Sequence, residues 1–273
     1  MPEQGHLLPN SFTLNGVDCF LLQLDKLMWQ SSGKRNVCTF VVTLPERLTI
    51  EDLHRQLAKR LIYQWLCRLR LREGLPFCLS KWVLETKAEL PVINEYQLAS
   101  EEALPDTVLS ANLDIKTQSA FKIDLLQVAG AGSILVFTWH HVLMDAHGGE
   151  MFVRYLGAAH PEIPPDWLAD DVVKLPLKVR ANIASEMKQF LFNVAQLPVL
   201  SLYKKMSVTP QARYCTLSFT PQQMSSINNR ARQLHAGFMA SAFYLAATAN
   251  AVAQVQKQRG DTSGDVLVPI PLD

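Results

Sequence analysis

The alternation of apolar and polar positions predicts a strand and a long helix near the start of the chain. The run NVCTFVVTL, residues 36–44, is rich in β-branched residues and predicts a strand. Thr49 is a plausible N-cap for a following helix, with Glu51 and Asp52 in its first turn. Apolar residues then recur every four positions, so we expect one helix face to belong to the core. These residues are Leu53, Leu57, Leu61, Trp65 and Leu69.

A second pattern predicts a β-hairpin followed by a helix. FKIDLLQV (121–128) alternates at its start, AGAG permits a tight turn, and SILVFTW (133–139) is almost continuously apolar. The second strand is therefore expected to be buried on both faces. GGEMFVRYLGAA (148–159) is expected to begin a helix at its glycines.

Beyond residue 160 the pattern changes, because prolines punctuate the chain at positions 161, 164, 165 and 176 and indicate a crossover. RYCTLSF (213–219) predicts a strand. Thr220, Pro221 and Gln223 then fit the N-cap, N1 and N3 positions of a helix with a capping box. That helix is expected to present one apolar face and to end near a glycine. These positions are Met224, Ile227, Ala231, Leu234 and Gly237.

Together these elements predict an α/β protein in two layers, with a mixed sheet and flanking helices. An apolar helix over 238–255 and a strand DVLVPIP (265–271) complete the expected order. We predict an N-terminal lobe over 1–160, a crossover with a helix over 161–209, and the start of a second, incomplete lobe over 210–273.

Composition narrows the classes of partner. The 273 residues carry a formal net charge of +1 without long runs of one sign, so a nucleic-acid partner is not expected. The five cysteines are odd in number and widely spaced, which favours reduced thiols and a cytoplasmic protein. Polar residues interrupt 238–255, so a buried helix is favoured over a membrane span. Residues 190–206, with Pro198 and two terminal lysines, are expected to pack on the domain, and a peripheral position on a membrane is the alternative.

The strongest chemical signal is FTWHHVLMDAHGGEMF, residues 137–152, at the end of the predicted buried strand. His141 is the candidate general base, provided that one ring nitrogen is free and the other is held as a donor. Asp145 is expected to brace the turn, and His140, on the opposite face of the strand, to be a hydrogen-bonded structural residue. Gly148 and Gly149 would allow a close approach of the chain as the helix begins.

Two other interpretations of this cluster remain open. His141, Asp145 and His147 could ligate zinc or iron in a metal-dependent hydrolase, although no second histidine cluster supplies a further ligand. The cluster could also be purely structural, because polar residues often end a strand. We find no Walker loop, dinucleotide-binding glycine motif or paired CxxC in the chain.

The segment HHVLMD resembles the HHxxxD signature of the CoA-dependent acyltransferase superfamily, which includes chloramphenicol acetyltransferase, condensation domains and the wax ester synthase and diacylglycerol acyltransferase group. The order of elements is also similar, from LNGVDCFLLQLD (14–25) to VLVPIPLD (266–273), the latter resembling the wax ester synthase group. The resemblance covers most of the chain and implies a chloramphenicol acetyltransferase-like lobe followed by part of a second one. In this chain Ala146 and His147 separate the aspartate from Gly148.

The resemblance implies an acyltransferase without a tightly bound cofactor. His141 would act as general base on an alcohol or amine, which attacks the thioester of an acyl-CoA or of an acyl group on a carrier protein. Asp145 would take a structural role through a salt bridge to an arginine. A truncated chain could be inactive because the second lobe contributes groups to the site, so a non-catalytic module that binds an acyl chain or a carrier protein is the alternative.

Overall fold

The computed structural model describes residues 8–74, 79–99, 104–161, 176–195, 217–234 and 240–260. The chain divides into two compact units, the first comprising residues 1–172 and 208–214 and the second residues 173–207 and 215–273. Among the described residues, both β-sheets lie in unit 1, and unit 2 contains three helices. The predicted α/β class, with a mixed sheet and flanking helices, is confirmed.

The larger sheet has four strands in the order β2-β7-β6-β5. They are β2 (Val37–Leu44), β7 (Ser133–His140), β6 (Phe121–Val128) and β5 (Asn94–Leu98). β5 pairs with β6 in parallel and the other neighbours are antiparallel, so the sheet is mixed. The predicted hairpin is confirmed, with Gly130 in the left-handed region at φ 72° in its turn. All eight residues of β7 are buried, as the apolar run predicts.

The smaller sheet has three strands in the order β1-β4-β3, each antiparallel to its neighbour. They are β1 (Ser11–Thr13), β4 (Lys81–Leu84) and β3 (Leu69–Arg72). Helix α1 (Gly16–Ser32) follows β1 in the chain and precedes β2. It begins at a capping box formed by Asn15 and Asp18. The segment LNGVDCFLLQLD (14–25) therefore contains the N-cap and the first residues of α1.

The sequence pattern predicted one continuous helix after β2. This prediction is wrong, because the structure has two helices there. These are α2 (Ile50–Leu57), for which Thr49 is the N-cap as expected, and α3 (Leu61–Arg68). Between them Arg60 adopts an extended backbone, which interrupts the helix, and its Nη2 donates to the carbonyl of Ala158 at 2.6 Å.

This break changes which residues of the apolar stripe are buried. Leu57 is only 4% exposed, but Leu61, at the first position of α3, is 56% exposed. Leu69 is fully buried, but it belongs to β3 and not to a helix. A four-residue spacing predicts a common face only while the helix is continuous. The expectation that Leu61 is core is therefore wrong.

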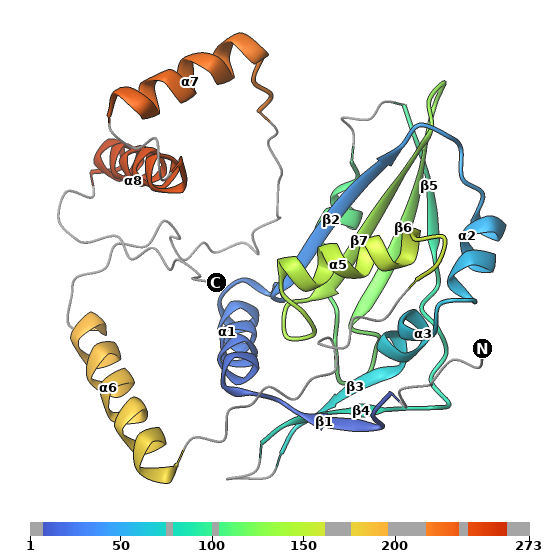
Figure 1. The fold of residues 1–273 in the computed structure, drawn as a ribbon, viewed down its shortest axis with the longest axis horizontal. Coiled ribbons are helices and arrows are strands. Elements are labelled where there is room, and N and C mark those ends of the chain that lie inside the picture. The colour runs from blue at the N-terminus through green and yellow to red at the C-terminus, as the bar shows by residue number, and fades with distance from the viewer. Residues whose placement is uncertain are drawn as a thin grey trace. The chain divides into compact units, whose positions relative to one another are not determined.

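Helices α3 and α5 (Ala146–Gly157) cover one face of the larger sheet, and Figure 1 shows α5 lying across the strands. The ring of Phe121 on β6 lies 6.2 Å from that of Tyr63 on α3 and 5.1 Å from that of Phe152 on α5. On the opposite face, Val136 packs in a smaller cluster with Val108 of the short helix α4 (Asp106–Leu109). Each face of β7 thus has its own apolar layer.

Unit 2 contains α6 (Leu177–Ala195), α7 (Pro221–Gln233) and α8 (Ala240–Gln258). The predicted capping box at the start of α7 is confirmed, since Thr220 and Gln223 each accept the other's backbone N–H. On the predicted apolar face of α7, Ala231 is buried whereas Leu234 is 54% exposed.

Several predictions for the second half fall outside the described residues. They concern residues 213–216 of the first predicted strand, the strand 265–271, and the helix end at Gly237. The described part of the first strand, residues 217–219, is not in a β-strand. The predicted lobe boundaries at 160 and 209 therefore stay predictions.

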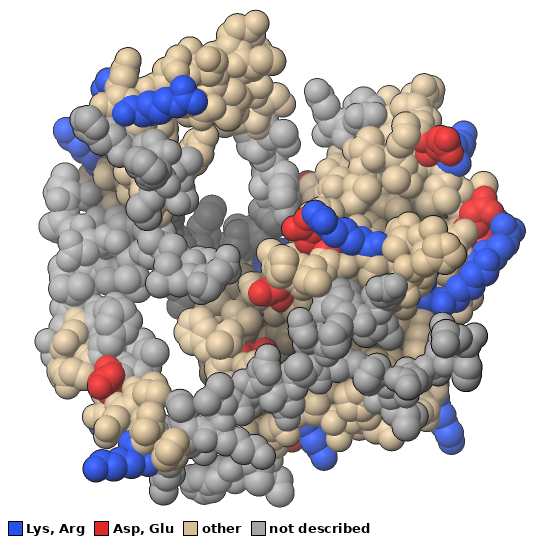
Figure 2. Space-filling view, in the orientation of Figure 1, with Lys and Arg blue, Asp and Glu red and all other residues tan. Residues whose placement is uncertain are grey.

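Within the described residues, no helix combines the length and apolar character that a membrane crossing requires. Charged side chains on the face of unit 1 in Figure 2 lie in small groups of both signs. Cys19, Cys38 and Cys67 are free thiols, as expected, and Cys78 and Cys215 lie outside the described residues.

The break between α2 and α3 predicts unequal effects for two leucines of the same stripe. Leu57→Ala is expected to lower the free energy of unfolding by about 2–5 kcal/mol, because it leaves a cavity in the core. Leu61→Ala is expected to change it by about 0.5 kcal/mol or less, because its side chain already contacts solvent. Urea unfolding of both variants measures this, and equal losses would show that α2 and α3 form one continuous amphipathic helix.

Candidate functional site

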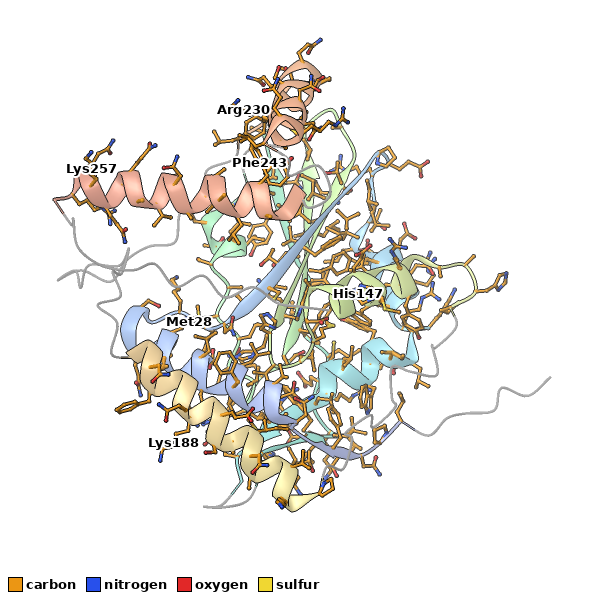
Figure 3. The ribbon with its side chains drawn as sticks, turned by 60° about the vertical axis from the view of Figure 1, so that its left-hand side comes forward. Met28, His147, Lys188, Arg230, Phe243 and Lys257 are labelled. Carbon is orange, nitrogen blue, oxygen red and sulfur yellow. The ribbon has the colours of Figure 1, made fainter. Side chains whose placement is uncertain are left out.

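The candidate site lies where β7 ends, and its last two side chains point to opposite faces of the sheet. Trp139 is buried against the start of α5, and its Nε1 donates to the carbonyl of Met144 at 2.9 Å. His140 points the other way, toward α1. The labels Met28 on α1 and His147 on α5 in Figure 3 mark these two helices.

His140 is completely buried and both of its ring nitrogens have neighbours. Its Nε2 lies 3.1 Å from Oδ1 of Asp25, on α1. Its Nδ1 accepts the backbone N–H of Val142 at 3.3 Å. His140 therefore holds internal contacts and has no nitrogen available to a substrate.

Asp25 is 2% exposed and is compensated on both oxygens. Arg35 Nη1 donates to Oδ2 at 2.9 Å, and the backbone N–H of Asn36 donates to Oδ1 at 2.8 Å. Burial would raise the pKa of this carboxyl, but the contacts with His140, Asn36 and Arg35 outweigh it and lower the pKa to about 2. The guanidinium of Arg35 also lies 4.4 Å from the ring centre of Trp29.

His141, the candidate base, is the partly exposed member of the pair. Its backbone N–H donates to the carbonyl of Asn36 at 2.9 Å. The ring Nδ1 is buried and has no hydrogen-bond partner in the part of the chain that the structure describes. A general base of this kind needs one ring nitrogen held as a donor, and the described residues supply no acceptor for it.

Asp145 is exposed and is the N-cap of α5, where its Oδ1 accepts the N–H of Gly148 at 2.6 Å. Its cap lies directly after the turn that follows β7. The salt bridge to an arginine that the resemblance implies is not present in residues 8–161 as far as they are described. An aspartate-arginine pair near the motif is instead formed by the buried Asp25 and the partly exposed Arg35.

The metal interpretation required His141, Asp145 and His147 to converge. Among the described residues, no three histidine, cysteine or acidic side chains are grouped so that they could hold a metal ion. His147 is exposed in the first turn of α5, where Figure 3 labels it, while Nδ1 of His141 is buried. The three side chains therefore do not form the proposed ligand set.

The two glycines have different surroundings. The helix α5 begins at Ala146 and not at the glycines, because Asp145 caps it two residues earlier than predicted. A Cβ on Gly149 would overlap the indole ring of Trp139, so this glycine allows α5 to lie directly on the sheet. A Cβ on Gly148 would meet Oδ1 of Asp145 at 3.2 Å, which is tight but less severe.

Sequence reasoning missed Asp25 as a member of the site. The signal was present, since Asp25 stands three residues after Leu22 on the face of α1 that is buried. An acidic residue on an apolar stripe needs a partner, but the sequence alone did not indicate that the partner is His140.

No protein-family model matches the chain, and no curated protein matches it. Solved structures with a similar fold include the starter condensation domain of rhizomide synthetase RzmA, with 13% identity and a TM-score of 0.48 over 70% of this chain and 50% of that one. Another is the X-domain in complex with OxyB from teicoplanin biosynthesis, with 19% identity and a TM-score of 0.45 over 69% of this chain and 40% of that one.

A third is the first condensation domain of the calcium-dependent antibiotic synthetase in complex with substrate analogue 2a, with 12% identity and a TM-score of 0.44 over 54% of this chain and 36% of that one. The chain spans half or less of the length of these structures.

The contact between α5 and Trp139 predicts a sharp difference between two glycines of one helix. Gly149→Ala is expected to destabilise unit 1 by about 1–3 kcal/mol, because the added methyl group displaces the indole or the helix. Gly157→Ala, where a Cβ has no neighbour within 4 Å, is the matched control and is expected to be neutral or slightly stabilising. Denaturant unfolding followed by tryptophan fluorescence measures both, and a neutral Gly149→Ala would contradict the direct packing.

The lowered pKa of Asp25 predicts a pH-dependent contribution to stability. The carboxyl is depressed from its ordinary 3.8 to about 2, so its contribution is complete above about pH 5 and is lost as the pH falls toward 2. The free energy of unfolding of the wild type, compared with Asp25→Asn, is expected to exceed that of the variant by about 2 kcal/mol at pH 7 and to approach it only as the pH falls to about 2.

Asp52→Asn is the control for this pH series, because Asp52 is an exposed partner of Arg55. We expect it to change stability by about 0.5 kcal/mol or less across the series. A gap between wild type and Asp25→Asn that is independent of pH would show that the carboxyl is not held in its charged form by its neighbours.

Proposed function

We propose that this chain carries the base of an acyltransferase, with His141 taking a proton from an alcohol or amine acceptor. The observation that supports this is the asymmetry of the two histidines. His140 is buried with both nitrogens in contact, whereas His141 is partly exposed and no described residue hydrogen-bonds its ring. A ring nitrogen of His141 is therefore free to take a proton.

In the proposed reaction, Nε2 of His141 accepts the proton of the acceptor O–H or N–H group as the acceptor atom attacks the thioester carbonyl carbon. The resulting tetrahedral intermediate collapses with cleavage of the carbon–sulfur bond. The leaving thiolate then takes the proton from the imidazolium, which restores the neutral ring. The products are an ester or amide and a free thiol, with no covalent intermediate on the protein.

Asp145 is proposed to support this step through the backbone, because no arginine among the described residues pairs with it. By capping α5 it fixes the turn between His141 and the helix, and the packing of Gly149 on Trp139 holds that helix against the sheet. His141 is thereby held directly after the last residue of β7, which favours its correct positioning relative to a substrate.

The donor is proposed to be an acyl thioester of CoA or of a carrier protein. Condensation domains are named among the solved structures with a similar fold, and the HHVLMD motif resembles theirs. O-acylation is favoured by the wax ester synthase-like stretch at 266–273. The free thiols of Cys19, Cys38 and Cys67 favour a reducing, cytoplasmic setting.

A non-catalytic binding module is the second candidate, and one observation favours it. No described residue offers Nδ1 of His141 the acceptor that would orient a general base. A module of this kind would retain affinity for an acyl thioester or for an acyl-carrier protein without turning it over.

The test of the proposed function is the replacement His141→Ala, with His147→Ala as the matched control. Release of free thiol from acyl-CoA and from acyl-N-acetylcysteamine is followed with alcohol and with amine acceptors. We expect His141→Ala to lose about 10²-fold or more in turnover at unchanged stability, because the general base is removed. His147→Ala is expected to retain activity, since His147 is exposed on α5 and separate from the base.

Equal turnover in wild type and His141→Ala would overturn the base role. Binding of the same thioesters without thiol release in wild type would favour the non-catalytic module. The same assay distinguishes ester from amide formation, because each product is identified by its mass.

A further inference from the structure

We propose that Asp25 is a positioning residue that fixes the backbone on both sides of His141. The proposal rests on the proposed role of His141 as the base. It assigns a function to a carboxylate on α1, far from the motif in sequence, that touches neither the reacting atoms nor His141 itself. Two chains of contacts start from a single carboxylate oxygen, Oδ1 of Asp25.

The first chain of contacts runs through the residue before β2. Oδ1 of Asp25 accepts the backbone N–H of Asn36 at 2.8 Å. The carbonyl of Asn36 in turn accepts the backbone N–H of His141 at 2.9 Å. The peptide group preceding His141 is thereby tied to α1 through one buried residue.

The second chain of contacts runs through the ring of His140. The same Oδ1 lies 3.1 Å from Nε2 of His140, close enough for an ion-pair contact although the two atoms are not aligned as a hydrogen bond, and Nδ1 of that ring accepts the backbone N–H of Val142 at 3.3 Å. Because Nδ1 accepts a hydrogen bond, the proton of the neutral ring is on Nε2, facing the carboxylate. Asp25 thus favours the tautomer that lets His140 hold the peptide group following His141.

The ring of His141 depends on this backbone arrangement because no described side chain holds its Nδ1. Asp25 is kept in place and in its charged form by Arg35, which donates to Oδ2 at 2.9 Å. The charged or titratable groups that face the carboxylate from described elements are Arg35, next to β2, and His140, on β7. Loss of Asp25 should therefore loosen His141 without removing an atom that reaches a substrate.

The first experiment reads the imidazole rings directly, so it does not depend on activity. In the full chain labelled with ¹⁵N-histidine at pH 8, we expect His140 to show the signals of a single tautomer with the proton on Nε2. In Asp25→Asn the charge is lost, and we expect the His140 nitrogen signals to shift toward a mixture of tautomers. The backbone amide signals of His141 and Val142 are expected to move or broaden with them.

The second experiment measures kinetics in the thiol-release assay. Asp25→Asn is expected to lower kcat at least ~10-fold while KM stays within about 2-fold, because a displaced base slows the proton transfer without changing the substrate contacts. Asp25→Glu, which restores the charge with one more methylene, is expected to recover part of kcat and the His140 tautomer.

Asp124→Asn is the matched control, since Asp124 is also fully buried and paired, with Lys122 and Asn94, in the same sheet. It is expected to lower stability while leaving the His140 tautomer and the His141 amide signal unchanged. The same spectral change in both variants would reduce Asp25 to a general contributor to stability.

Two results would overturn the positioning role whether or not the chain is an enzyme. One is a His140 ring protonated on Nδ1 in the wild type, which needs no variant. The other is a folded Asp25→Asn protein whose His141 and Val142 amide signals do not move. Absence of thiol release in the wild type, with the expected spectra, would instead contradict the proposed function and leave the positioning role standing.

Discussion

The site is organised by a buried negative charge that must be compensated. Removing a carboxylate from water costs several kcal/mol unless hydrogen bonds and an opposite charge replace the water. Asp25 meets this requirement with the guanidinium of Arg35, the backbone N–H of the next residue, Asn36, and the imidazole of His140, which come from two places in the chain. The need to satisfy one carboxylate therefore brings α1, the start of β2 and the end of β7 together.

The two sides of β7 serve different purposes at its end. On one side Trp139, Gly149 and the carbonyl of Met144 form a closely packed contact that places α5 against the sheet. On the other side His140 joins the sheet to α1 through a polar contact. His141 follows directly after both, so its location is determined by packing on one face and by charge compensation on the other.

Local patterns were sufficient to predict most individual elements of the fold. The hairpin of β6 and β7, strand β2 and the caps of α2 and α7 follow from periodicity and from side chains that bond to nearby backbone, and each involves residues close in sequence. The break before Leu61 was not predictable in this way. The residue at the break, Arg60, donates to the carbonyl of Ala158, which is 98 residues away in sequence, and no local pattern indicates this contact.

The residues of the candidate site likewise separate into those whose positions local sequence predicts and those that depend on distant contacts. The positions of His140 and Asp145 at a strand end and a helix cap follow from their neighbours in sequence. Asp25 could not be joined to them, because its contact with His140 spans 115 positions and depends on how α1 packs. The finding that no described residue accepts a hydrogen bond from Nδ1 of His141 likewise comes from the structure, and no spacing in the motif indicates it.

The hydrogen bond from Arg60 to Ala158 has a mechanical consequence for α5. The helix is held at its beginning by its contact with Trp139, and the residue after its end is held by the guanidinium from the junction of α2 and α3. With contacts at both ends, α5 can neither tilt nor slide without disturbing β7 or the junction of α2 and α3. Any movement of α5 away from the strands would also have to break the hydrogen bond between Arg60 and Ala158.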